Sequence, residues 1–165
     1  MTARRLRNER GLTLTELTIV GLLATIVMVA LTGFYIHSQQ LWTDASTQAL
    51  AQRDAALLVT ELRHRINEAN DAAVSATDND HDHLSLTYLN RPFQTVEFAW
   101  NVSNRKMHLW IDGHDQGPVV DTPVAQFKLQ TVDSPVTRVD LVQALLSTAA
   151  GDSVGITSSF ALRGR

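Results

Sequence analysis

The chain has 165 residues, a formal net charge of −3 and no cysteine. A length of this order suits one modest domain with an appendage, and the missing thiols exclude disulfides, thiolate catalysis and thiolate metal sites while leaving the redox compartment undecided. Hydrophobic residues make up 44% and charged residues 19% of the chain, which is ordinary for a folded protein. The slightly acidic balance gives no signal for direct nucleic-acid binding, which requires a basic surface.

The charged residues are distributed very unevenly at the start of the chain. Residues 1–11 form a basic leader with four arginines and one glutamate, and after Glu16 no charged residue occurs before Asp44. The apolar residues 17–36 cover about 30 Å as a helix, the thickness of a bilayer's hydrocarbon core. Because the arginines precede this segment, the positive-inside tendency predicts a single-pass protein of the cytoplasmic (inner) membrane, with a cytoplasmic N-terminus and an extracytoplasmic head.

Two simpler interpretations of this segment explain less. A cleaved secretory signal usually has an apolar region of only about 7–15 residues, and the best cleavage site, at Ala30-Leu31-Thr32, lies inside the apolar run. A plain signal anchor explains the length and the arginines but not Glu16, because a carboxylate held at depth in a membrane costs about 2–3 kcal/mol. At the very end of the helix, however, Glu16 can also reach the headgroups at small cost.

The residues around Glu16 carry a more specific pattern. The string Arg10-Gly11-Leu12-Thr13-Leu14-Thr15-Glu16-Leu17 resembles the prepilin processing motif of the type IV pilin family, which includes the pseudopilins of type II secretion. The resemblance implies cleavage between Gly11 and Leu12 by prepilin peptidase and N-methylation of Leu12, where the family usually has phenylalanine. Glu16 then provides the negative charge that pairs with the new terminal amine of a neighbouring subunit during assembly.

The resemblance also implies a role and a set of partners. It indicates a structural subunit of a pilus-like filament rather than an enzyme, serving type II secretion, a pilus or a competence apparatus. Its partners are other pilin or pseudopilin subunits, prepilin peptidase, an inner-membrane assembly platform and membrane lipid. Residues 57–66 and 160–165 further resemble minor pseudopilin J and the minor pilin W type, which favours a minor over a major subunit.

Helical character continues beyond the apolar segment. Residues 37–73 contain no proline or glycine and are rich in good helix formers. Their apolar positions recur at spacings of three and four, which places them on one side of a helix. These positions are Ala51, Ala55, Leu58, Leu62, Ile66 and Ala69. We therefore expect a helix over residues 12–73 whose second half is amphipathic and covers a sheet.

From residue 74 to residue 165 the hydrophobic period changes to two. Leu84, Leu86 and Tyr88 alternate with polar residues, and similar alternation follows in later segments. Strands are expected near residues 84–88, 96–102, 107–111, 125–129, 136–146 and 154–163, with breaks at Gly117-Pro118, Pro123 and Asp133-Ser134-Pro135. The predicted fold class is α+β: a long N-terminal helix, with a transmembrane half and an amphipathic half, packed on a small antiparallel β-sheet head of four to six strands.

One cluster in the head contains several possible metal ligands, Asp78, Asp80 and Asp82, alternating with Asn79, His81 and His83. The alternation is similar to the start of an EF-hand loop, but the glycine expected sixth is His83 and the glutamate expected twelfth is Leu89. A solvated loop is the simpler interpretation. We expect no cofactor and no metal site, with calcium at the three aspartates as the weak alternative.

Catalytic patterns are sparse. His108, Asp112, His114 and Asp115 flank a strand end, where they suit a turn as well as an acid–base group. Gly151-Asp152-Ser153 is similar to an esterase nucleophile block, but neither histidine nor a carboxylate residue follows it. Two alternatives to a filament subunit stay open: an uncleaved single-pass membrane protein with a small extracytoplasmic binding head, and an anchored hydrolase that depends on His108 or His114.

Overall fold

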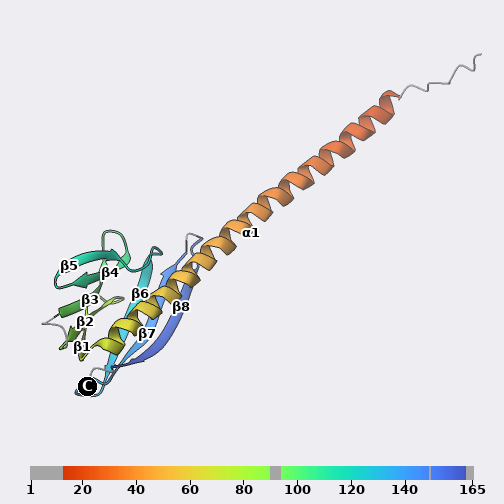
Figure 1. Cartoon of the computed structure of the whole chain (residues 1–165). Coiled ribbons are helices and arrows are strands. Elements are labelled where there is room, and N and C mark those ends of the chain that lie inside the picture. Colours follow the sequence, from red (N-terminus) through yellow and green to blue (C-terminus); the bar gives the residue numbers. More distant parts are fainter. Residues whose placement is uncertain (1–12, 90–93, 149, 163–165) are drawn as a thin grey trace, which may run out of the picture. The chain divides into compact units, whose positions relative to one another are not determined.

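The computed structural model describes residues 13–89, 94–148 and 150–162. It contains one long helix and eight strands in this part of the chain (Figure 1). The chain divides into two compact units, Met1–Thr43 and Asp44–Arg165. The expected fold class is confirmed, since the helix packs on antiparallel sheets through its C-terminal half.

Helix α1 spans Leu14–Glu68. It ends five residues before the expected boundary at residue 73, so that part of the prediction was wrong. The Tyr88 hydroxyl donates to the Arg65 carbonyl at 2.9 Å, and the Asn70 amide donates to the Thr87 carbonyl at 2.9 Å. These contacts come from a strand distant in sequence, and they satisfy backbone groups at the point where the chain leaves the helix.

The predicted apolar stripe of α1 is confirmed. Ala51, Ala55, Leu58, Leu62 and Ile66 are all buried, and Ala69 just beyond the helix is buried too. Arg53, Arg63 and His64 are exposed on other sides of the helix. The periodicity is reliable here because a helix with one covered side must repeat its apolar residues every three or four positions.

The first sheet has five antiparallel strands in the order β1-β2-β3-β4-β5. The strands are β1 Asp71–Ala76, β2 Asp82–Tyr88, β3 Gln94–Asn101, β4 Lys106–Ile111 and β5 His114–Pro118. Leu84 pairs with Phe98, and Phe98 pairs with Leu109, so apolar residues of three neighbouring strands share one face. Leu84, Leu86 and Tyr88 are buried, as the alternation predicts.

Two of these strands were not expected. Strand β1 begins at residues 71–73, which were assigned to the end of the helix, and β5 contains the Gly117-Pro118 pair interpreted as a break. Strand β5 lies at the edge of its sheet, where a proline without an N–H group is tolerated. Gly117 has a φ of 100°, which favours glycine, and the β4–β5 register shifts beside it between Leu109 and Trp110.

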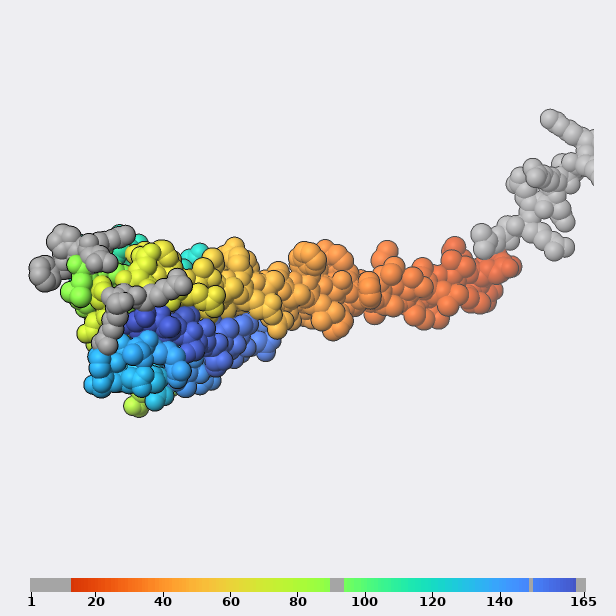
Figure 2. All heavy atoms as spheres, turned by 60° about the horizontal axis from the view of Figure 1, so that its bottom comes forward, coloured from red at the N-terminus to blue at the C-terminus, as the bar shows by residue number. Residues whose placement is uncertain are grey.

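The second sheet has three antiparallel strands, β6 Val124–Val132, β7 Arg138–Ser147 and β8 Ser153–Ala161, in that order. The expectation of a single sheet with four to six strands was therefore wrong. These strands run alongside the C-terminal half of α1 in Figure 1, and Figure 2 shows the blue strands against the yellow part of the helix. One buried cluster joins residues of α1 and of both sheets, including Leu62, Phe98 and Phe127.

Candidate functional site

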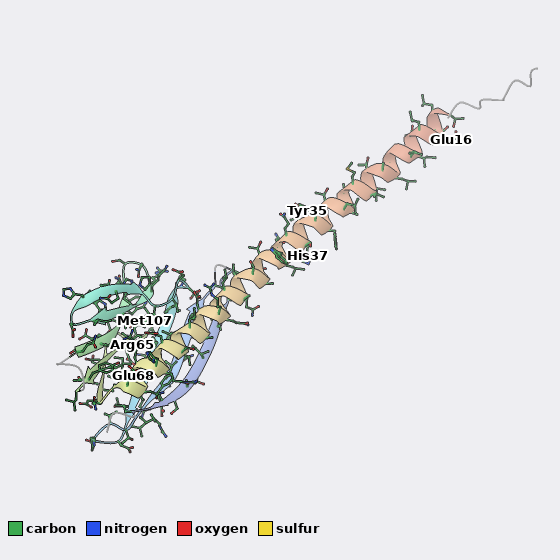
Figure 3. The ribbon with its side chains drawn as sticks, viewed as in Figure 1. Glu16, Tyr35, His37, Arg65, Glu68 and Met107 are labelled. Atoms are coloured by element: carbon green, nitrogen blue, oxygen red, sulfur yellow. The ribbon has the colours of Figure 1, made fainter. Side chains whose placement is uncertain are left out.

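The first described residues form a capping box at the start of α1. The Thr13 amide and hydroxyl both donate to Glu16 Oε2, at 2.8 and 2.9 Å, and the Glu16 amide donates to Thr13 Oγ1 at 3.3 Å. This reciprocal arrangement satisfies amides that a helix start leaves unpaired. Glu16 is exposed, and its carboxylate is held at the positive end of the helix dipole (Figure 3). The predicted processing residues, Gly11 and Leu12, lie outside the described residues.

The apolar segment that follows Glu16 is exposed along its whole length. Its best window has a mean hydropathy of 2.3, so α1 contains a candidate membrane span by length and composition. The hydroxyls of Thr18, Thr25 and Thr32 each donate at 2.8 Å to a backbone carbonyl four residues earlier. Because these donors are satisfied within the helix, they add little to the cost of placing it in lipid.

The weak calcium candidates are not arranged as a metal site. Asp78 Oδ1 accepts the amides of Asp80 and His81, both at 2.7 Å, and faces His81 Nδ1 at 2.9 Å. Asp82 turns away from them, accepting the Leu129 amide at 2.8 Å and the Lys128 ammonium at 3.2 Å. Within residues 13–89, 94–148 and 150–162, no group of three or more potential ligands is placed to hold a metal ion.

These residues instead connect the two sheets. The Phe127 amide donates to the Asp80 carbonyl at 2.8 Å, so the β1–β2 connection covers part of the edge of β6. His81 is buried and stacks on Trp100, with ring centroids 3.8 Å apart. The amide of Asp80, together with His81, holds the pKa of Asp78 below its usual range despite some opposing desolvation. A cluster that resembles a ligand loop in sequence therefore performs a structural role.

The second candidate group is only partly assembled. His108 Nδ1 lies 2.8 Å from Asp115 Oδ2, and its Nε2 faces the Asn104 side chain at 2.7 Å. The Gly117 amide, more than His108, lowers the pKa of Asp115. Asp112 instead accepts the Thr95 amide at 2.9 Å, and His114 is exposed on β5. The structure thus pairs the buried His108 on β4 with the exposed Asp115 on β5, rather than assembling a group of four.

The block Gly151-Asp152-Ser153 lies at the end of the β7–β8 connection and the start of β8. Gly151 has a φ of 89°, and the Asp152 carbonyl accepts both the amide and the hydroxyl of Thr148, at 2.8 and 3.1 Å. Ser153 is the first residue of β8 and is exposed. This geometry is that of a hairpin turn.

Asp54 is the buried ionisable residue that the sequence pattern did not single out. It is 3% exposed, and its Oδ2 accepts the Thr122 amide at 2.9 Å, the Thr122 hydroxyl at 2.8 Å and the Asp121 amide at 3.2 Å. Burial raises the pKa of Asp54, but the bonds from Thr122 and Arg53 outweigh it and keep the pKa below the usual range. The sequence contained a signal for its burial, because Asp54 lies next to the apolar positions 51, 55 and 58 of the helix stripe.

The chain was also compared with known proteins. No family model, no curated protein and no solved structure matches it.

Proposed function

We propose that this chain is a minor pilin or pseudopilin, a structural subunit of a type IV pilus-like filament that serves type II secretion, a pilus or a competence apparatus. The observation that carries the proposal is the single helix Leu14–Glu68. Its first residue is two positions after Leu12; the helix continues as an exposed apolar segment, and its last turns carry the apolar stripe that is buried under the head. One element of this kind suits both insertion in a membrane and the core of a filament.

Processing precedes assembly in this proposal. The chain is inserted in the inner membrane with its head outside, and prepilin peptidase cuts after Gly11. Leu12 becomes the methylated first residue, two positions before the first residue of α1. The assembly platform then moves the subunit from lipid into the filament, where the apolar segment packs against those of other subunits.

Glu16 has a defined role in that assembly. Its carboxylate is oriented toward the helix start by Thr13, the residue next to the new terminus. In an apolar filament core, this carboxylate pairs with the terminal amine of a neighbouring subunit. An incorrect register leaves one buried charge unpaired, at a cost of about 3–5 kcal/mol, so the pair selects the correct axial step.

Intact-mass measurement tests the proposal. The full chain is expressed with and without prepilin peptidase, and we expect loss of the eleven leader residues only when the peptidase is present. Gly11→Val should block the cut, while Thr2→Val, a substitution inside the leader but away from the junction, should not. An unshortened chain in the presence of an active peptidase would falsify the proposal and favour the uncleaved membrane protein.

Glu16→Gln separates processing from assembly. The neutral amide can still accept the Thr13 bonds, so we expect the helix start to persist while incorporation into filaments falls. The measurement is the fraction of cleaved subunit recovered in sheared filaments. Normal incorporation of this variant would exclude the charge-pairing role.

A further inference from the structure

Two large aromatic side chains are exposed near the end of the apolar segment of α1, Tyr35 within its last residues and Trp42 beyond it. Trp42 is 78% exposed and Tyr35 is 61% exposed. The two tryptophans of the head, Trp100 and Trp110, are by contrast partly buried. Aromatic rings contribute much of their stabilising energy only when they leave water, so such exposure indicates a surface that is covered in the working protein.

Tyr35 and Trp42 lie on the same side of α1. They are seven residues apart, close to two helical turns. Both line a notch of about 420 Å³ together with Ser38, Gln39 and Thr43. Gln39 Nε2 donates to the Tyr35 hydroxyl at 2.8 Å, so the notch is lined by two aromatic rings and by polar groups.

The position of the notch matches the boundary of a bilayer. If residues 17–36 fill the hydrocarbon core, the backbone of Trp42 lies about 9 Å beyond its edge, at about 1.5 Å per residue. Helical side chains lean toward the N-terminus, which brings the Trp42 ring back toward the level of Ser38 and Gln39. The interfacial layer is about 5–8 Å thick on each side of the core, so the Trp42 ring lies within it. The Tyr35 ring lies at the inner edge of this layer, where its hydroxyl bonds to the Gln39 side chain.

We propose that Tyr35 and Trp42 form an interfacial anchor, with the notch between them occupied by phospholipid headgroups of the extracytoplasmic leaflet. Headgroups offer phosphate and ester oxygens, which are acceptors, and the Trp42 indole N–H and the Tyr35 hydroxyl are donors. The ring bodies contact the first carbons of the acyl chains, which is the placement that tryptophan and tyrosine favour in membrane proteins. This inference rests on the membrane span in the proposed function and adds the depth at which the span is held.

Fluorescence quenching by brominated lipids tests the anchor. The full chain with Trp100→Phe and Trp110→Phe has Trp42 as its only tryptophan. It is reconstituted in phosphatidylcholine vesicles brominated either near the glycerol end or near the methyl end of the acyl chains. We expect blue-shifted emission and stronger quenching by the shallow bromines. Quenching by neither lipid, or stronger quenching by the deep bromines, would overturn the anchor.

Two controls keep the result interpretable. Val27→Trp, combined with Trp42→Phe in the same background, places the probe in the middle of the apolar segment and should be quenched most by deep bromines. If this probe is quenched and Trp42 is not, the anchor is wrong while the span stands; if neither is quenched, both are wrong.

The second control keeps the head unaltered, because Trp100 stacks on His81 and its replacement could disturb the head. The quenching of the native chain is compared with that of Trp42→Phe, and the difference between them is the quenching of Trp42. No difference would also overturn the anchor. Peptidase cleavage is scored separately, so failure of the anchor is distinguishable from failure of the filament proposal.

Discussion

Replacing Asp54 tests how α1 is attached to the head. Its carboxylate accepts bonds from Thr122 and Asp121, in the segment before β6, and from Arg53 on its own helix. Asp54→Ala leaves these donors without their acceptor. Each hydrogen bond to a charged group contributes about 1.5–3 kcal/mol, but the contributions do not add fully. The Arg53 side chain is 61% exposed, so its ion pair adds little.

Access of water to the site limits the loss of stability that we expect. Asp54 borders a cleft of about 370 Å³, which also contains Thr47 and Ser147 and lets water reach the freed amides. We therefore expect Asp54→Ala to lower the free energy of unfolding by about 2–4 kcal/mol. Asp54→Asn should lower the free energy of unfolding by only about 1–2 kcal/mol, because the side-chain amide oxygen of asparagine still accepts the hydrogen bonds from Thr122. For a head of this size, each kcal/mol shifts the melting temperature by about 4 °C.

The assay is thermal unfolding of the full chain in detergent micelles, followed by the fluorescence of the head tryptophans. The matched control is Asp44→Ala, which removes an exposed aspartate from the same helix and should change stability by less than about 0.5 kcal/mol. If Asp54→Ala is as stable as this control, the bonds to the segment before β6 do not hold the helix in place, and the reasoning fails.

Three further outcomes follow from the head. Phe98→Ala should lower the free energy of unfolding, measured by chemical denaturation, by about 3–5 kcal/mol, because the ring is fully buried. The control Val102→Ala changes a residue that is 72% exposed and should leave this free energy nearly unchanged. The pKa values of Asp78 and Asp115 are lowered in the folded state, so their contribution is present above the unfolded aspartate pKa and is lost on acidification below about pH 5; melting temperatures that rise on acidification would contradict this. Calorimetry of the full chain with calcium or zinc should show no binding heat, and saturable heat would reopen the metal assignment at the aspartates before β2.

The sequence by itself determined the features that depend on near neighbours along the chain. The apolar segment, the stripe from Ala51 to Ala69 and the alternation of Leu84, Leu86 and Tyr88 follow from the periods of helix and strand, so they were predicted correctly. Glu16 was singled out for a role in assembly, which stays a prediction, and the structure adds that it forms a local capping box with Thr13, three residues before it. Each of these patterns is fixed within a few residues, where spacing in sequence defines spacing in space.

Only the tertiary structure decided how the strands divide into two sheets and what the buried polar groups contact. Asp54 bonds to Thr122, 68 residues away, and the helix end is fixed by Tyr88, 23 residues beyond Arg65. The sequence left calcium at Asp78 and Asp82 as the lesser alternative, and it could not show that Asp78 pairs with His81 or that Asp82 accepts the Leu129 amide. Backbone pairing between strands, and the satisfaction of buried polar groups, depend on partners that sequence spacing does not specify, because many pairings share the same alternation.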